Sequence, residues 1–335
     1  MRRAVAILVL LAFSAAGALA QGAASDATGK PSAADISKEV LGPRAPVDEA
    51  YGAYQRGYYL TALALALPRA KEDDATAQTL IAELYANGLG VAQDLKRAAS
   101  WYALADKNGD YHASFALALL YQQGNGVEKN SAKAATLFEK AANAGYLPAK
   151  YNLALLYVQG VDVKPDAIRA AQLMKEAADG GLAEAQYDYG TMLIEGAGVA
   201  PNPELGAHET GLAAAQGLIA AQVDYATMLY LGQGVTRDLH AAARWYARAA
   251  EAGNPVAQNR YAKMLAVGEG VDLDLQSAAM WRALARRQGL NDPSLDKLLV
   301  SISPDDLAKA EQRARYWPGK APDSAPDPAT ASKSP

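Results

Sequence analysis

The sequence predicts an all-α protein in which one pair of helices is repeated along the chain. A glycine recurs every 36 residues, without insertion, at Gly88, Gly124, Gly160, Gly196, Gly232 and Gly268. A second glycine column and an alanine column keep this spacing; they are Gly109, Gly145, Gly181, Gly217, Gly253 and Gly289, and Ala77, Ala113, Ala149, Ala185, Ala221 and Ala257. Self-similarity at such a period indicates a solenoid of stacked units. Six repeats therefore cover residues 75–290.

The Gly-x-Gly stretches, such as GLG at residues 88–90, raise the alternative of a phosphate-binding loop. A dinucleotide loop carries a third glycine after a strand, and a nucleoside triphosphate loop ends in Gly-Lys-Ser/Thr. This stretch has neither ending, and GNGV, GAGV, GQGV and GEGV recur at the equivalent place in other repeats. We therefore interpret the stretches as structural turns and expect no cofactor.

Each repeat is predicted to contain two helices joined by this turn. The first runs from about Ala77 to Ala86 and ends at Gly88, since glycine supplies the left-handed backbone that favours a helix end. In the second helix Ala98, Trp101, Tyr102 and Ala105 have the spacing of one buried face. In the first helices an aromatic and an aliphatic residue four positions apart trade places between repeats, as in Ile81/Tyr85 and Tyr189/Leu193, which indicates that these tyrosines belong to the core.

The second helix is expected to begin at a column of capping residues, which are Asp94, Asn130, Asp166, Asn202, Asp238 and Asp274. Their side chains can accept hydrogen bonds from the free N–H groups of a first turn. The alternative is a row of carboxylates for metal binding or proton transfer. The uncharged Asn130 and Asn202 occupy the same column, which favours capping.

The ends of the chain differ from the repeats. Residues 1–20 have two arginines, an apolar run and Ala18 and Ala20 around Leu19, the pattern of a secretory signal peptide cleaved after Ala20. Residues 21–46 and 318–335 are rich in small residues and proline, and we interpret them as a flexible linker and a disordered tail. Residues 47–74 and 291–317 are predicted to be an atypical capping helix pair and closing helices.

Composition excludes several classes of function. The chain has no cysteine, so disulfides, thiolate metal sites and a cysteine nucleophile are excluded. The formal charge is −4, and it becomes −6 once Arg2 and Arg3 leave with the signal peptide, which argues against a nucleic-acid groove. No stretch beyond the signal is predicted to span a membrane. We expect a periplasmic or secreted protein.

The motifs of common enzymes are absent or isolated. One Ser-x-x-Lys occurs at Ser294 to Lys297, without the other motifs of a serine β-lactam enzyme, and it is interpreted as a helix start. The histidines are His112, His208 and His240, with no pair at i and i+4. Since zinc needs three or four converging ligands, we predict no metal site and no catalytic residue, although His208 and His240 could approach each other.

The repeat pattern, with its Gly-x-Gly-Val turn, Asp or Asn cap and closing Ala-Ala-x-x-Gly, resembles the Sel1-like repeats, which are relatives of tetratricopeptide repeats. This resemblance implies a right-handed α-solenoid that serves as an adaptor for other proteins, often in bacterial envelopes. The third repeat departs from the pattern with Asp162 in place of a glycine. The fourth has Pro203, Gly206 and Gly211 within its second helix, so we expect a bend or soft joint there, or a decayed repeat without a role.

We therefore predict a non-enzymatic protein-binding scaffold in the periplasm of a Gram-negative bacterium, with a role in signalling or envelope assembly. The alternative is an accessory of an envelope enzyme that binds glycan or peptidoglycan strands.

Positions that vary between repeats are free to contact a partner, and on the first helix they form a stripe on one face, which in the first repeat is Thr76, Leu80, Glu83 and Asn87. From this stripe the candidate partner-binding residues are His112, Leu119, Gln123, Pro148, Leu155, Gln159, Glu184, Thr191 and Glu195. The alternative is ordinary solvated variation.

Overall fold

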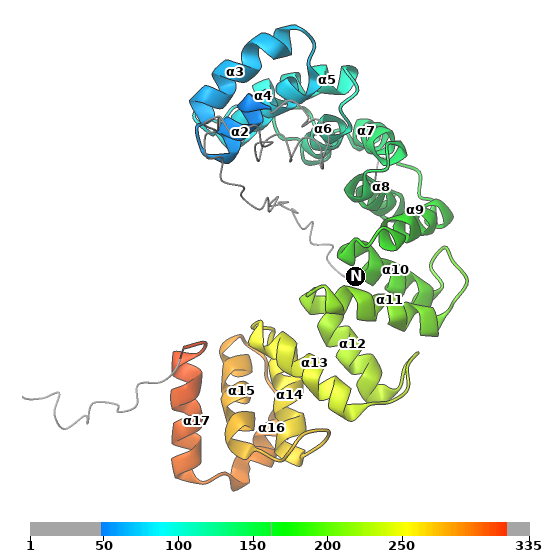
Figure 1. Ribbon diagram of the computed structural model, residues 1–335. Helices are drawn as coiled ribbons and strands as arrows, with labels where there is room; N and C mark the ends of the chain where they lie inside the picture. Colours follow the sequence, from blue (N-terminus) through cyan, green and yellow to red (C-terminus); the bar gives the residue numbers. More distant parts are fainter. Residues whose placement is uncertain (1–47, 162, 320–335) are drawn as a thin grey trace, which may run out of the picture.

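The computed structural model describes residues 48–161 and 163–319, which form a curved array of helices without a strand (Figure 1). The helices of the six repeats are α4 (Ala75–Asn87), α5 (Leu95–Lys107), α6 (Tyr111–Gln123), α7 (Ser131–Asn143), α8 (Leu147–Gln159), α9 (Ala167–Asp179), α10 (Ala183–Glu195), α11 (Pro203–Ala215), α12 (Ile219–Leu231), α13 (Leu239–Glu251), α14 (Pro255–Val267) and α15 (Leu275–Arg287). The predicted signal peptide, the linker at 21–46 and the tail beyond Gly319 lie outside the described residues. Asp162 does so as well.

Each repeat consists of two 13-residue helices, as α4 and α5 illustrate. The backbone at Gly88, which ends α4, is left-handed with φ of 66°. The side chain of Asp94 accepts a hydrogen bond from the N–H of Arg97 and so caps α5. The same capping bond occurs at Asn130 and Asn202. The glycine stretches are therefore turns, and capping needs no charge.

Where a turn has a second glycine, that glycine permits a close approach between repeats. A Cβ atom at Gly90 would lie 2.8 Å from the Cβ of Tyr59, and one at Gly234 would overlap the carbonyl group of Pro203. Both contacts involve the first residue of the second helix one repeat earlier. The turn of one repeat thus rests on the preceding repeat, which fixes the stacking.

The core consists mainly of small residues where helices meet. A second alanine column, in the second helices, is also the same in all six repeats and has no exposed surface; it is Ala105, Ala141, Ala177, Ala213, Ala249 and Ala285. In the alternating pairs the aliphatic member is buried in every repeat, whereas only Tyr189 is buried among the tyrosines and the other five are half-buried. The aliphatic residues are therefore the core of these pairs, and most of the tyrosines lie at its edge.

The glycines of the fourth repeat lie where helices approach closely. A Cβ on Gly190 of α10 would be 2.8 Å from the carbonyl oxygen of Gly206 in α11, and the reverse distance is also 2.8 Å. A Cβ on Gly211 would lie 3.0 Å from the ring of Tyr225. The helix α11 is as long as the others. Packing thus explains these glycines, while the bend stays a prediction.

Both ends of the array carry additional helices. Helices α2 (Glu49–Gln55) and α3 (Tyr59–Lys71) precede the first repeat. Helix α16 (Pro293–Leu298), a 3₁₀ turn η1 (Leu299–Ser301) and α17 (Pro304–Tyr316) follow the last. At that end the rings of Trp281 and Trp317 make an edge contact with centroids 4.9 Å apart.

Candidate partner-binding surface

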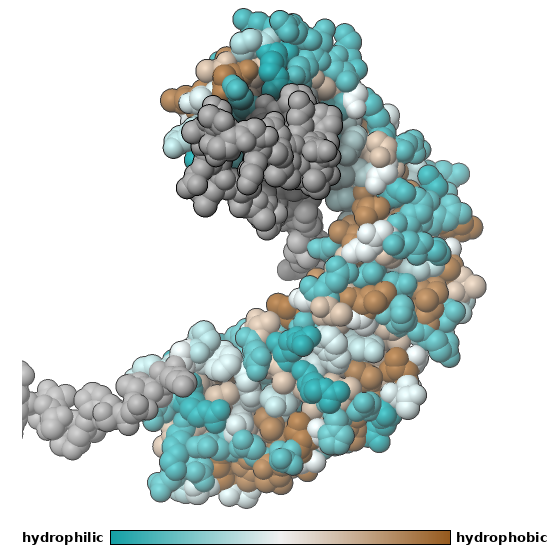
Figure 2. All heavy atoms as spheres, viewed as in Figure 1, coloured by the Kyte–Doolittle hydropathy of each residue, from teal (hydrophilic) through white to brown (hydrophobic). Residues whose placement is uncertain are grey.

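The first helices of the repeats form a continuous surface along the inside of the arc. Figure 1 shows α6 and α8 on the hollow side, with α7 and α9 outside them. Side chains of consecutive first helices meet there, because Tyr151 of α8 bonds to Asp188 of α10 and Tyr187 of α10 bonds to Asp224 of α12. The face in view in Figure 2 mixes hydrophilic and hydrophobic residues along the arc. We therefore define the candidate surface by the helices that form it and not by its hydropathy.

The predicted residues divide into two groups by exposure. His112, Gln123, Gln159 and Glu195 are exposed, whereas Leu119, Pro148, Leu155, Glu184 and Thr191 are half-buried. Leu119 and Leu155 pack on the same core cluster. One member of the original stripe is not on the surface, because Leu80 is 5% exposed and belongs to the core.

Aromatic side chains gather at the start of α6 and α8. The ring of Tyr146 lies 5.2 Å from that of His112, 5.6 Å from that of Tyr111 and 5.1 Å from that of Phe115, between centroids. The Nδ1 atom of His112 is 3.3 Å from a carboxylate oxygen of Asp110. This group is an amphipathic platform with exposed ring surface at Tyr111.

Carboxylates occupy the middle of the inner surface and are bonded across repeats. The hydroxyl of Tyr151 donates to Asp188 at 2.9 Å, and that of Tyr187 donates to Asp224 at 2.6 Å. Burial and the nearby charge of Glu184 raise the pKa of Asp188 above its ordinary value, although the bond from Tyr151 opposes the shift. The carboxylate form of Asp188 is therefore held in an unfavourable environment.

A second carboxyl group in such an environment lies in the first repeat. Burial, together with the charge of Asp110, raises the pKa of Glu83, and a hydrogen bond from Tyr54 opposes this. Asp110 accepts a bond of 2.5 Å from the hydroxyl of Thr79. The inner surface thus accumulates negative charge at two places.

The last repeat places two cations on this surface. Arg260 of α14 donates to the hydroxyl groups of Thr227 and Tyr246 at 3.0 and 2.9 Å. Lys263 pairs with Asp292 at 2.7 Å. Carboxylates thus lie toward both the N-terminal end and the middle of this surface, the aromatic and apolar groups lie between them on α6 and α8, and the cations lie on α14.

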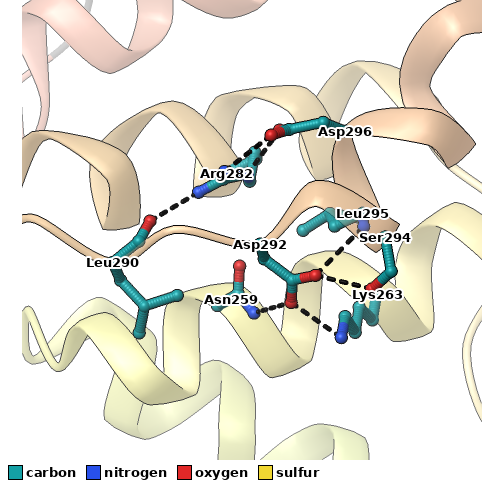
Figure 3. A network of polar contacts seen from close by, with 8 residues as sticks. All are labelled: Asn259, Lys263, Arg282, Leu290, Asp292, Ser294, Leu295 and Asp296. Carbon is teal, nitrogen blue, oxygen red and sulfur yellow. Dashed lines mark hydrogen bonds and ion pairs between the residues drawn. The ribbon is translucent and has the colours of Figure 1, made fainter.

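The isolated enzyme-like features have structural roles. Ser294 donates to Asp292 at 2.6 Å within the cap of α16, so this serine begins a helix as predicted (Figure 3). His240 contacts the carbonyl oxygen of Gly270 at 2.8 Å. Within residues 48–161 and 163–319, no three His, Asp or Glu residues are arranged to hold a metal ion.

Two features of this surface were missed from the sequence. The tyrosine–aspartate bonds join residues 37 positions apart, and they could have been found by comparing neighbouring columns of successive repeats. The polar network that closes the C-terminal end was also missed, in which buried Arg282 makes two bonds to Asp296 and one to the carbonyl of Leu290 (Figure 3). The repeat pattern does not predict this network, because Asp296 lies beyond the last repeat.

The fold and this surface define an α-solenoid of stacked helix pairs. The model of the Sel1 repeat matches residues 75–110, 112–146, 147–182, 183–218, 219–254 and 255–290. The chain belongs to the Sel1 repeat family, whose members generally mediate protein–protein interactions. A search of curated proteins found no match.

The solved structures that are similar to this chain include two Sel1 repeat proteins. A protective antigen of uropathogenic Escherichia coli, c5321, displays the Sel1-like repeat fold at 26% identity and a TM-score of 0.68, with 76% of this chain and 56% of that chain covered. A Sel1 repeat protein from Oxalobacter formigenes has 26% identity and a TM-score of 0.64, with 72% of this chain and 98% of that chain covered. This chain thus spans little more than half of the antigen.

Proposed function

We propose that this protein is a non-enzymatic scaffold of the bacterial envelope, periplasmic or secreted, that binds a protein partner on its inner surface. The Sel1 repeats support the class of function. The sequence of residues 1–20 supports export, and none of the described helices combines the length and hydrophobicity that crossing a bilayer requires. A role in signalling or envelope assembly agrees with that location.

The proposal rests mainly on the environment of the Asp188 carboxyl group on the inner surface. A half-buried carboxylate with a raised pKa destabilises the folded protein at neutral pH relative to a neutral side chain. Its position on the inner surface, next to Glu184, would be explained if a partner supplies the compensating positive charge. Leu119 of α6 and Leu155 of α8 supply partly buried apolar groups on the first helices that precede it.

The aromatic platform favours the second candidate, a glycan- or peptidoglycan-binding accessory. Tyr111 is 36% exposed and stands against Tyr146 and His112 on the same surface. Aromatic faces with hydroxyl groups can pack on the apolar face of a sugar ring while bonding its hydroxyls. Sedimentation with purified sacculi tests this candidate, since an adaptor for proteins should remain in solution.

The main experiment is the double variant Leu119→Asp, Leu155→Asp, crosslinked in living cells and followed by mass spectrometry. The matched control is Leu104→Asp, Leu212→Asp, which changes exposed leucines of the second helices α5 and α11. We expect both variants to fold by circular dichroism and only the inner-surface variant to lose its crosslinked partners. Equal capture by the two folded variants would exclude this surface.

A further inference from the structure

The inner surface at Arg260 shows how a repeat satisfies a buried tyrosine. Tyr246 of α13 is 2% exposed, and its hydroxyl oxygen lies 2.8 Å from that of Thr227 in α12. Arg260 of α14 donates to the Tyr246 and Thr227 oxygens at 2.9 and 3.0 Å. Its guanidinium carbon also lies 5.8 Å from the centre of the Tyr246 ring. A cation from the next first helix therefore completes the polar contacts of this tyrosine.

One repeat later the same positions form an ion pair. The residues that follow Tyr246 and Arg260 by 36 positions are Arg282 and Asp296. Arg282 is 3% exposed and makes bonds of 2.7 and 2.9 Å to the Asp296 carboxylate (Figure 3). In both repeats the buried polar side chain of the second helix thus bonds to a charged group from the following helix.

The second, third and fourth repeats do not need such a group. Phe138 and Met174 occupy the tyrosine position in the second and third repeats, and both are buried apolar residues. In the fourth, the hydroxyl of Thr210 donates to the carbonyl of Gly206 in its own helix at 2.9 Å. This position is therefore satisfied within the chain in every repeat from the second to the sixth.

The first repeat has a buried tyrosine but no charged group to complete its contacts. Four repeats before Tyr246, Thr227 and Arg260, the chain has Tyr102, Glu83 and Ala116. Tyr102 is 6% exposed, and Ala116 packs against the cluster that contains it. Burial and the charge of Glu83 raise the pKa of Tyr102, and no hydrogen bond from the described residues contributes to the shift. The hydroxyl of Tyr102 therefore lacks the partners that Tyr246 has.

The carboxylates around Tyr102 make this place negative. Glu83 is half-buried, and its pKa is raised by burial and by the charge of Asp110, while a hydrogen bond from Tyr54 opposes the shift. The Nδ1 atom of His112 lies 3.3 Å from Asp110, but no lysine or arginine of the described residues pairs with either carboxylate. A positive group at Ala116 would therefore meet a carboxylate and an unbonded hydroxyl together.

We propose that an arginine side chain of the protein partner lies against Ala116 on the inner surface and bonds to Glu83 and Tyr102, as Arg260 bonds four repeats later. The inference rests on the proposed partner-binding function and names the chemistry that the partner brings to the N-terminal half of the surface. A planar guanidinium suits this place, because it donates to several oxygens at once and stacks on aromatic rings. It also neutralises a carboxylate whose charged form is disfavoured by burial.

Titrations with a small probe, followed by saturation-transfer NMR on the chain from Gln21, test the site directly. The probe is N-acetyl-arginine amide, and N-acetyl-citrulline amide is its uncharged isostere. We expect the arginine probe to bind at least about tenfold more tightly than the citrulline probe, because a hydrogen bond to a charged group contributes about 1.5–3 kcal/mol. Glu83→Gln and Ala116→Arg should each weaken the arginine probe by a similar factor. The control Glu139→Gln, which removes an exposed carboxylate of α7, should not.

A stability measurement shows whether Ala116→Arg fills the site from within the chain. Its urea midpoint should exceed that of Ala116→Gln, since the new guanidinium can bond to Glu83 and Tyr102. Adding Glu83→Gln to both variants should remove this difference. An Ala116→Arg midpoint no higher than that of Ala116→Gln would contradict the inference.

The probe results separate this inference from the function on which it rests. Equal binding of the two probes, or equal binding of the arginine probe by Glu83→Gln and Glu139→Gln, would overturn the arginine site. If Leu119→Asp, Leu155→Asp still lost its crosslinked partners in cells, the scaffold function would stand without the site. Folded Ala116→Arg should lose the same partners. Full capture by it, beside a loss in the leucine variant, would show that the partner does not use the site.

Discussion

The side-chain oxygen of Gln186 accepts a hydrogen bond from the side-chain nitrogen of Gln216, 30 residues later, at 2.7 Å. The same relationship joins Gln78 to Asn108 and Gln258 to Gln288. Each of the three buried acceptors also donates to a carbonyl group eight residues earlier. These amides bridge consecutive repeats. The buried glutamine lies near the start of a first helix; it donates to the end of the second helix of the preceding repeat and accepts from the end of the second helix of its own repeat.

One such bridge is incomplete, and completing it should stabilise the protein. Gln222 is 4% exposed, and its side-chain oxygen has no hydrogen-bond partner among the described residues, because the position 30 residues later is Ala252. We expect Ala252→Gln to raise the free energy of unfolding by about 1 kcal/mol in a urea titration. The control is Ala144→Gln, which faces no glutamine; an equal gain there would exclude this explanation.

The invariant alanine column should not accept a larger residue. Ala249 has no exposed surface and lies beside Trp245 and Tyr246 in the core of the C-terminal repeats. We expect Ala249→Leu to lower the free energy of unfolding by about 1–3 kcal/mol through overpacking. The exposed Ala103→Leu should leave the denaturant midpoint nearly unchanged. An unchanged midpoint for Ala249→Leu would contradict the role of this column in the core.

The two kinds of turn glycine should differ in their tolerance of alanine. Gly217 has φ of 96° with open space around it, so Gly217→Ala should cost only backbone strain, about 1–2 kcal/mol. Gly234 has φ of 67°, and an added Cβ would also overlap the carbonyl group of Pro203. We expect Gly234→Ala to be the more destabilising in chemical denaturation. The reverse order would show that stacking does not depend on this approach.

Removing the Asp188 charge should stabilise the isolated protein at neutral pH. Burial and Glu184 raise the pKa of this carboxyl group in the folded state, so the folded protein holds the proton more tightly than the unfolded chain. Stability is therefore lost as pH rises from about 4 through the folded pKa. Asp188→Asn keeps an acceptor for Tyr151 and avoids this loss.

The measurement is urea denaturation at pH 7 and below pH 4 for wild type, Asp188→Asn and Asp224→Asn. The Asp188 variant should be the more stable at pH 7 and lose its advantage at the lower pH. Asp224 is exposed and accepts the equivalent bond from Tyr187, so its variant should change little. A pH-independent effect of Asp188→Asn would show that charge burial is not the cause.

Much of the fold could be predicted because the same local sequence signals recur in each repeat. The turn at Gly88 and the cap at Asp94 depend on residues close in sequence, so six copies of the same local signal fixed the helix pair. The binding surface was predicted less well. Leu80 was assigned to the variable stripe, yet it is buried, because α2 and α3 pack over the first repeat and bring it into their core.

By itself the sequence determined the repeat period, the helix ends and the alanine column at Ala249, because glycine conformation, capping and residue size act over a few bonds or recur in register. Tertiary structure alone decided the contacts between repeats. Gly206 against Gly190 shows how closely two helices approach, and Tyr151 bonded to Asp188 shows which groups meet on the inner surface. Such contacts depend on the rotation between stacked helix pairs. That rotation is set by the packing of whole helix faces and is not encoded by any single residue.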